Sequence, residues 1–519
     1  MSPTPSPDTV ETPAPTGPNR RARRVRRVRR AGVAGVLALA VVAAACGGDD
    51  GGSGDGDGAS ERGAPADAEN CPAAALDDAS GVTQVTVWHA YTAKTQEALE
   101  QAATDYNASQ DRVEVSVEAQ GSYPELLKKY EDSLGTPEDL PDVVFSEDTT
   151  LQFMHDSGSV IPAADCIAAD PDAEAFYDDL LPAVRNAYSI DEKLWAASYG
   201  VSMPVMYVNN DHFDAAGLAT DEYPGTLDEV RAAAEKIQAA NIAELEAPVV
   251  MQLYGWFPEN WITGARQVIV DEDNGRAALA TESEFDNEVT TEVVEWMDQM
   301  QADGLLKAYP YSSDITQFLA LGNGTASILI DGSRAITTVD AVVSGAESEP
   351  PEGVDVGDLD QEELAGLDVA VAAVPGVEEP GQGAVWGSAA FLVAGSDDAS
   401  VAGGWDFLQF FNSTPVQTQW LLDGSYLPVT QAVQDAPEVQ AYFADNRAGS
   451  WLSTVNEQLL SIDPEFPGPA IGPYNEFRAG LHAMLDDVVL GSVTPADGIA
   501  EMDTTFQDEL EGYASEIGG

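Results

Sequence analysis

Cysteine and histidine are scarce in this sequence of 519 residues, which has three cysteines and four histidines. No CxxC pair and no cluster of cysteine with histidine occurs, which argues against a zinc site and against thiol redox chemistry. The GxSxG, Walker A and HExxH patterns of three large enzyme classes are absent as well. We therefore expect neither a metal nor an organic cofactor.

Basic residues are rare beyond the first 45 residues. That segment holds eight of the 23 Lys and Arg but only two of the 89 Asp and Glu, which leaves 15 basic residues against 87 acidic ones. The remainder thus carries a net charge of about −72, which would repel a polyanion. Because nucleic-acid binding depends on basic side chains that displace counterions, the composition excludes nucleic acid as a natural partner.

The N-terminus carries a targeting signal. Arginines between Arg20 and Arg30 precede the apolar run AGVAGVLALAVVAAA and then Cys46. About 15 apolar residues after a basic head indicate a secretory signal and are short for a membrane span. The alanines before Cys46 resemble a bacterial lipobox, which predicts a signal peptide at 1–45, a lipidated Cys46 and a flexible tether at 46–70. The alternative is an uncleaved anchor helix. Under both interpretations the chain works outside the cytoplasm, on the outer face of the bacterial cell membrane.

The two other cysteines form an even pair in an oxidising compartment. We predict a disulfide between Cys71 and Cys166. It would close a loop of about 95 residues and stabilise the fold by about 4 kcal/mol in the chain-entropy model. Two buried free thiols are the alternative.

Strand-type and helix-type periodicities alternate along the chain, as is typical of an α/β protein. Valines alternate at 85–87 and at 113–117 around a helical stretch, and PDVVFS indicates a buried parallel strand. Further strands are expected at SMPVMYVNN and TASILIDGS, and capped amphipathic helices at GTLDEVRAAAEKIQAA and VTTEVVEWMDQMQADG. The roughly 440 residues after the tether suffice for two lobes with a large core.

Several short blocks, taken in order, resemble the extracellular solute-binding proteins of ATP-driven importers. The blocks are VTVWHAYT, DYNASQDRVEVSVEAQGSYPELLKK, PDVVFSED, SMPVMYVNNDHFDAAGL, GSYLPVTQAV and GPYNEFRAGLHAML. They span nearly all of residues 82–510, and within that superfamily they are most similar to the proteins that bind sn-glycerol 3-phosphate or glycerophosphodiesters. The resemblance implies a two-lobed periplasmic-binding-protein fold with a ligand cleft between lobes joined by hinge strands.

The resemblance also implies how the chain divides between the lobes. The first lobe would comprise 82–203 and 332–386, and the second 204–331 and 387–519. Crossings between the lobes are expected near Ser202, Asp331 and Gly387, where small or polar residues end or interrupt apolar strands.

The resemblance also implies nine ligand-binding residues: Tyr123, Glu147, Ser202, Trp256, Asp331, Gly387, Ser388, Tyr426 and Arg478. Arg478 matches the family arginine that pairs with phosphate, a role that suits the planar guanidinium fork. The alternative is a surface arginine opposite a carboxylate such as Glu476. Trp256 matches an aromatic residue that packs on the ligand. Tyr123 begins a helix, whose backbone N–H groups favour an anion.

Two positions depart from the family pattern. Asp331 stands where the family usually has a small hydroxyl residue, and Ser388 stands where it has a glycine. These departures leave the identity of the ligand open.

The function implied is that of a monomeric, non-enzymatic receptor. It would capture sn-glycerol 3-phosphate or a glycerophosphodiester and deliver it to an ABC permease and its ATPase. A neutral oligosaccharide is the alternative ligand, with Arg478 then structural. Two other classes are an extracellular glycosidase with two catalytic carboxylates and a passive adhesin. Turnover of a ligand would identify the glycosidase, and the absence of ligand-dependent stabilisation would identify the adhesin.

Overall fold

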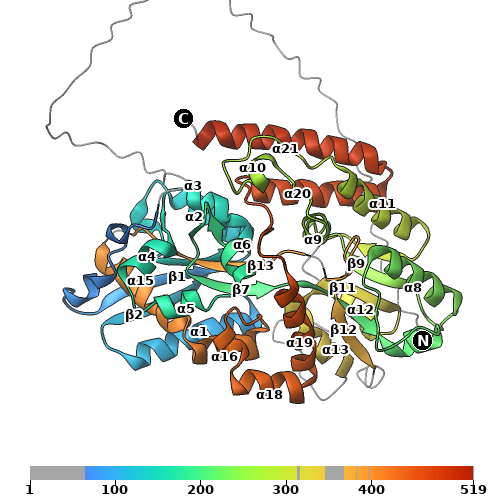
Figure 1. The fold of residues 1–519 in the computed structure, drawn as a ribbon, viewed down its shortest axis with the longest axis horizontal. Coiled ribbons are helices and arrows are strands. Elements are labelled where there is room, and N and C mark those ends of the chain that lie inside the picture. Colours follow the sequence, from blue (N-terminus) through green and yellow to red (C-terminus); the bar gives the residue numbers. More distant parts are fainter. Residues whose placement is uncertain (1–64, 312–315, 345–366, 382, 396, 518–519) are drawn as a thin grey trace, which may run out of the picture. The chain divides into compact units, whose positions relative to one another are not determined.

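The computed structural model describes residues 65–311, 316–344, 367–381, 383–395 and 397–517. The predicted signal peptide at 1–45, Cys46 and most of the predicted tether at 46–70 lie outside these residues. The described chain folds into two mixed sheets flanked by helices (Figure 1). The predicted α/β class is confirmed.

The first sheet has the strand order β2-β1-β3-β13-β4, with β7 also paired to β13. Strand β1 is parallel to β2 and β3, whereas β13 is antiparallel to β3, β4 and β7. Val85, Val87 and most of β3 are buried, as their apolar pattern predicts. The strands are β1 (Thr83–His89), β2 (Val113–Ala119), β3 (Val143–Glu147), β4 (Val160–Ile161), β7 (Ser198–Ser202) and β13 (Trp386–Val393).

The second sheet has the order β10-β9-β11-β8-β12. Strand β9 is parallel to β10 and β11, and β8 is antiparallel to β11 and β12. Every residue of β8 and β9 is buried, because helices cover both faces, and this accounts for their continuous apolar runs. The strands are β8 (Pro204–Asn209), β9 (Ala247–Gln252), β10 (Leu306–Tyr309), β11 (Ala326–Gly332) and β12 (Val369–Ala373); β5 (Ser189–Ile190) and β6 (Lys193–Leu194) form a separate pair.

Each sheet and its principal helices form what we call a lobe. The first lobe contains the first sheet with α1 (Ala93–Ser109), α2 (Tyr123–Ser133), α3 (Leu151–Asp156), α15 (Asp398–Phe411) and α16 (Thr414–Gly424). The second contains the second sheet with α7 (Asn210–Ala215), α8 (Leu227–Ala239), α9 (Trp256–Gly264), α11 (Glu288–Ala302), α12 (Thr316–Gly322), α13 (Ile336–Ser344), α19 (Arg447–Ser461), α20 (Tyr474–Leu485) and α21 (Pro495–Ile517). The other α-helices of the described chain are α4 (Ala163–Ala169), α5 (Glu174–Asp178), α6 (Pro182–Ala187), α10 (Asp271–Asn274), α17 (Gln431–Gln434) and α18 (Pro437–Asp445).

Helix α8 shows why these segments become helices. The Thr226 hydroxyl caps it by accepting a hydrogen bond from the Glu229 N–H at 3.2 Å. Val230, Ala234 and Ile237 follow at helical spacing and are buried in the second lobe. The predicted capped, amphipathic helix is confirmed.

The strand pairing differs from the predicted division of the lobes. Strand β12 pairs with β8 of the second sheet, although the sequence assigns 332–386 to the first lobe. Strand β13 pairs with β3 and β7 of the first sheet, and α15 packs on that sheet, although the sequence assigns 387–519 to the second lobe. The crossing near Asp331 is wrong, because α13 stays against α12 and α19. An apolar run does not reveal which of two sheets it joins.

The disulfide between Cys71 and Cys166 is present, with a Cα–Cα distance of 5.0 Å. It joins the residues near the start of the described chain to α4. Asp165, next to Cys166, also accepts hydrogen bonds from the Asp67 backbone N–H at 2.9 Å and the Asn70 side chain at 3.0 Å. The start of the described chain is thus fixed to the first lobe.

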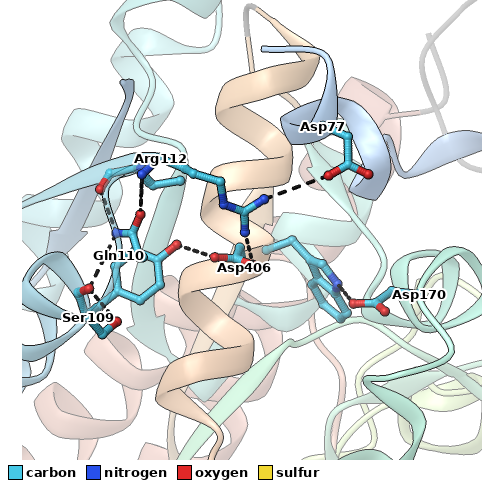
Figure 2. Close-up of polar contacts among 9 residues, drawn as sticks. Asp77, Ser109, Gln110, Arg112, Asp170 and Asp406 are labelled. Carbon is cyan, nitrogen blue, oxygen red and sulfur yellow. Dashed lines mark hydrogen bonds and ion pairs between the residues drawn. The ribbon is translucent and has the colours of Figure 1, made fainter. Parts of the chain in front are cut away.

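A polar network holds α15 near the first sheet (Figure 2). The Arg112 guanidinium lies 3.5 Å from Asp406 and 3.9 Å from Asp77. Asp406 also accepts a hydrogen bond from the Tyr106 hydroxyl at 2.5 Å. Exposed pairs of this kind contribute about 1 kcal/mol or less, so the network orients the helix more than it stabilises the fold.

Arg276 joins distant segments through backbone carbonyls. Its Nη1 donates to the carbonyl oxygens of Ala187 at 2.9 Å and Ser189 at 2.8 Å, and its Nε donates to Gly468 at 2.9 Å. Nη2 donates to two further carbonyls of the same proline-rich segment at 3.4 Å. Burial lowers the pKa of Arg276 to about 10. We call this arrangement the Arg276 socket.

Candidate functional site

Side chains from both lobes line a cleft of about 420 Å³. Eight of the nine predicted site residues lie in its wall: Tyr123, Glu147, Ser202, Trp256, Asp331, Gly387, Tyr426 and Arg478. Ser388 is outside the lining; it is fully buried, and its Oγ lies 2.8 Å from the Tyr91 hydroxyl. Side chains alternate between the two faces of a strand, so the Ser388 side chain points away from the cleft wall in which its neighbour Gly387 lies.

Gly387 and Ser202 lie on adjacent strands where the chain leaves the first sheet. Ser202 ends β7 and pairs with Trp386, while Gly387 pairs with Val201. Gly387 has φ +141°, and a Cβ there would overlap the carbonyl oxygen of Gly200. Only glycine allows this close approach of the two strands at the cleft wall.

Arg478 lies at the centre of a buried ion-pair network. Arg478 lies on α20 and is 6% exposed. Its Nε donates to Glu259 at 2.9 Å, and its Nη1 donates to Glu147 at 3.1 Å and to the Tyr254 hydroxyl at 3.3 Å. Glu259, on α9, is fully buried and also accepts from the Tyr474 hydroxyl. We call Arg478, Glu147, Glu259 and Tyr254 the buried arginine centre.

The buried arginine centre links the two lobes. Glu147 ends β3 in the first lobe, whereas Arg478 and Glu259 belong to the second. The alternative of a surface arginine opposite Glu476 is wrong, because Arg478 is buried and pairs with Glu147 and Glu259 instead. The guanidinium charge is balanced by protein carboxylates before any ligand binds.

Two further carboxyl groups in the cleft have raised pKa values. Burial raises the pKa of Asp148 to about 8, and the Arg478 guanidinium opposes this rise. Burial raises the pKa of Asp331 to about 6, although Asp331 accepts hydrogen bonds from the Gly332 N–H at 2.7 Å and from Gln317 at 3.2 Å. Near neutral pH a protonated Asp148 can donate a hydrogen bond, while Asp331 accepts them.

An aromatic wall lines part of the cleft. Trp256 begins α9, with its ring centroid 5.9 Å from that of Tyr254. Tyr254 in turn stacks on the exposed Tyr311 at 4.5 Å. Such faces suit the C–H side of a polyol or a cationic head group. By contrast, Trp261 is buried in the core, where its indole N–H donates to a backbone carbonyl.

Arg334 is a cleft residue that sequence reasoning missed. It lies in the short turn Ser333–Ala335 after β11, lines the cleft, and is exposed to solvent there. Its guanidinium carbon lies 5.8 Å from the ring centroid of Tyr426. Tyr123 lines the same cleft, where burial raises its pKa and the Arg334 guanidinium opposes that rise. We call Arg334, Tyr426 and Tyr123 the open arginine centre.

No carboxylate forms an ion pair or hydrogen bond with Arg334 among the residues that the structure describes. The small or polar residues at the end of the run TASILIDGS placed an expected lobe crossing near Asp331, and Arg334 follows three residues later. The sequence thus contained a signal for this residue.

The start of α2 differs from the expectation of a helix end open to an anion. The Ser122 side chain accepts from the Glu125 N–H, and the Glu125 carboxylate accepts from the Ser122 N–H at 2.8 Å. This capping box places a carboxylate where the anion was expected. The position of Tyr123 in the cleft is therefore more informative than its place on the helix.

Within the described ranges, no group of three or more His, Cys, Asp or Glu side chains is arranged to hold a metal ion. None of the helices there has the length and apolar character that a membrane crossing requires.

Comparison with known proteins gives consistent matches. A family model described as bacterial extracellular solute-binding protein matches residues 101–445. The sn-glycerol-3-phosphate-binding periplasmic protein UgpB of Rhizobium meliloti (strain 1021) is 23% identical over 375 residues, 71% of this chain and 80% of that protein.

Solved structures match over most of the described chain. The GacH receptor of Streptomyces glaucescens GLA.O, solved unliganded and with acarbose, has a TM-score of 0.64 at 19% identity, covering 84% of this chain and 100% of that chain. UgpB from Mycobacterium tuberculosis in complex with glycerophosphocholine has a TM-score of 0.61 at 18% identity, covering 84% and 99%. These matches establish the two-lobed binding-protein fold.

Proposed function

The chain belongs to the bacterial extracellular solute-binding protein family, and from that premise we propose that its solute is sn-glycerol 3-phosphate or a glycerophosphodiester. It is a non-enzymatic receptor that binds a small solute outside the cytoplasm for an ABC transporter. The proposal concerns which solute the cleft accepts.

The observation that carries the proposal is the combination of groups in one cleft. The cleft wall contains two arginines, Arg334 and Arg478, in a protein with few basic residues, and a guanidinium group is suited to bind a phosphate. Glu147 and Asp331 can accept hydrogen bonds from glycerol hydroxyls, and Trp256 offers an aromatic face to the carbon skeleton or to a choline group. The names of the two UgpB relatives, which mention sn-glycerol 3-phosphate and glycerophosphocholine, support the same class.

Thermal stabilisation tests this proposal. The purified protein is heated with sn-glycerol 3-phosphate, glycerophosphocholine, glycerol, maltose or trehalose. A ligand at 100 times its Kd adds about 2.7 kcal/mol to the free energy of unfolding. We expect a rise in Tm with the two glycerophosphates and none with glycerol or the sugars. A rise only with the sugars would contradict the proposal.

A neutral oligosaccharide is the second candidate, and the pairing of Arg478 favours it. Since Glu147 and Glu259 already neutralise this guanidinium, Arg478 can be structural while carboxylates and Trp256 bind sugar hydroxyls and C–H faces. The same thermal panel separates the two candidates.

Attachment to the membrane through Cys46 is part of the proposed function. The apolar run and the alanines before Cys46 support it, since a signal peptide ending at a lipidated cysteine would leave the receptor at the cell surface. We expect Cys46→Ala to move the protein from the membrane fraction to the soluble one. Retention of the variant in membranes would indicate the uncleaved anchor instead.

A further inference from the structure

The two arginines in the cleft differ in what they can offer an anion. Arg478 makes charge-assisted hydrogen bonds to Glu259 at 2.9 Å and to Glu147 at 3.1 Å. Its Nη2 has no hydrogen-bond partner among the described residues, but the atom is buried and a ligand reaches it only after rearrangement. A phosphate placed there would also lie beside the two carboxylates, and like charges at short range repel.

Arg334 has the opposite surroundings. It is exposed to the cleft, and its neighbours across the cleft are the aromatic rings and hydroxyls of Tyr426 and Tyr123. Asp331, the carboxylate nearest in sequence, has its oxygens turned to the Gly332 N–H and to Gln317. A free guanidinium beside two phenol donors is a suitable site for phosphate oxygens.

We infer that Arg334, not Arg478, is the cation that binds the anionic group of the ligand. The phosphate lies between Arg334 on the second lobe and Tyr426 and Tyr123 on the first, so it draws the two lobes together. The glycerol hydroxyls then lie toward Glu147 and Asp148, next to the buried arginine centre. This inference rests on the proposed function and specifies which residue selects for charge.

The test is calorimetric binding of sn-glycerol 3-phosphate to the full chain and to four variants. Arg334→Gln removes the charge and should weaken binding about 100-fold, in the range expected for a charged hydrogen bond. Arg334→Lys keeps the positive charge but lacks the planar, two-pronged guanidinium group, and should weaken binding about tenfold. Arg266→Gln removes an exposed arginine outside the cleft that pairs with Asp463, and should change affinity less than twofold.

The fourth variant, Arg478→Gln, tests the rival assignment. Because this change can disturb folding, its Tm is measured alongside, and only folded protein enters the comparison. If Arg334→Gln binds with the affinity of the wild type, the inference is overturned while the proposed function stands. If the wild type does not bind any glycerophosphate, both are overturned. A smaller salt dependence of binding in Arg334→Gln than in the wild type is a second expected result.

Discussion

The two arginine centres of the cleft lie in one cavity, yet the protein treats their charges in opposite ways. In the buried arginine centre, carboxylates from both lobes hold Arg478, which is 6% exposed. In the open arginine centre, Arg334 faces solvent beside tyrosines. Both arginines line the same cleft, so a position in the cleft wall does not by itself make an arginine a ligand-binding residue. Arg478 is already paired with two carboxylates, whereas no described carboxylate forms an ion pair with Arg334.

The largest expected effect on stability comes from removing Arg478, with removal of Arg334 as the comparison. Arg478→Ala leaves the fully buried Glu259 without its counter-ion and should lower the free energy of unfolding by about 3–5 kcal/mol. Arg334→Ala should change it by about 0.5 kcal/mol. Urea denaturation at pH 7 measures both. Equal losses in the free energy of unfolding would contradict the distinction between the buried and the open arginine centre.

The pH dependence of stability tests whether Arg334 is unpaired. Burial raises the folded-state pKa of Asp331 from 3.8 to about 6, so the folded protein holds that proton more tightly than the unfolded chain does. The resulting stabilisation is full below pH about 4 and is lost as the pH rises through 6, by up to about 3 kcal/mol.

Asp331→Asn should remove this dependence when unfolding of wild type and variant is compared from pH 4 to 7. If Arg334 paired with Asp331, it would hold that pKa down. The two proteins would then show parallel pH profiles.

Glu147→Gln should have a smaller effect on stability. The change weakens the contact between the lobes but leaves Arg478 paired with Glu259, so we expect a loss of about 1–2 kcal/mol. Glu476→Gln, on the same helix as Arg478 but outside the centre, is the matched control and should be neutral. Urea midpoints of the two variants decide the matter. If Glu147→Gln leaves the urea midpoint unchanged, Glu259 alone balances the charge of Arg478.

The smallest expected effect concerns Trp256, which belongs to neither centre. Trp256→Leu keeps apolar volume but removes the aromatic face, and should weaken any bound ligand by about 1 kcal/mol, roughly fivefold. Because stacking does not depend on the ligand's charge, phosphate and sugar ligands should lose the same factor in affinity, measured by calorimetry. A loss restricted to one class would place Trp256 beside a group found only in that class.

The helices and strands could be predicted from local sequence patterns, but the strands with which each strand pairs could not. Alternating valines, the buried run PDVVFS and the capped helix after Thr226 each specify a strand or a helix through burial and capping that act within a few residues. Strands β12 and β13 are equally apolar, so only their packing against distant strands decides which sheet each one joins.

The candidate site shows the same limit. The resemblance to the solute-binding proteins selected nine residues, and eight of them line the cleft. Whether an arginine there is free depends on carboxylates far away in sequence: Glu259 is 219 residues from Arg478. The sequence therefore pointed to Arg478 for the anion and passed over Arg334, whose availability follows from the absence of an ion-pair partner in the described structure.

The Arg276 socket has a consequence for the order of folding. Its five carbonyl acceptors come from the neighbourhood of residue 188 and from residues 467–469. Residues 467–469 follow Arg276 by almost two hundred residues, so the socket can be completed only after this proline-rich segment has been synthesised. A chain that ends before residue 467 lacks three of the five acceptors and cannot complete the socket.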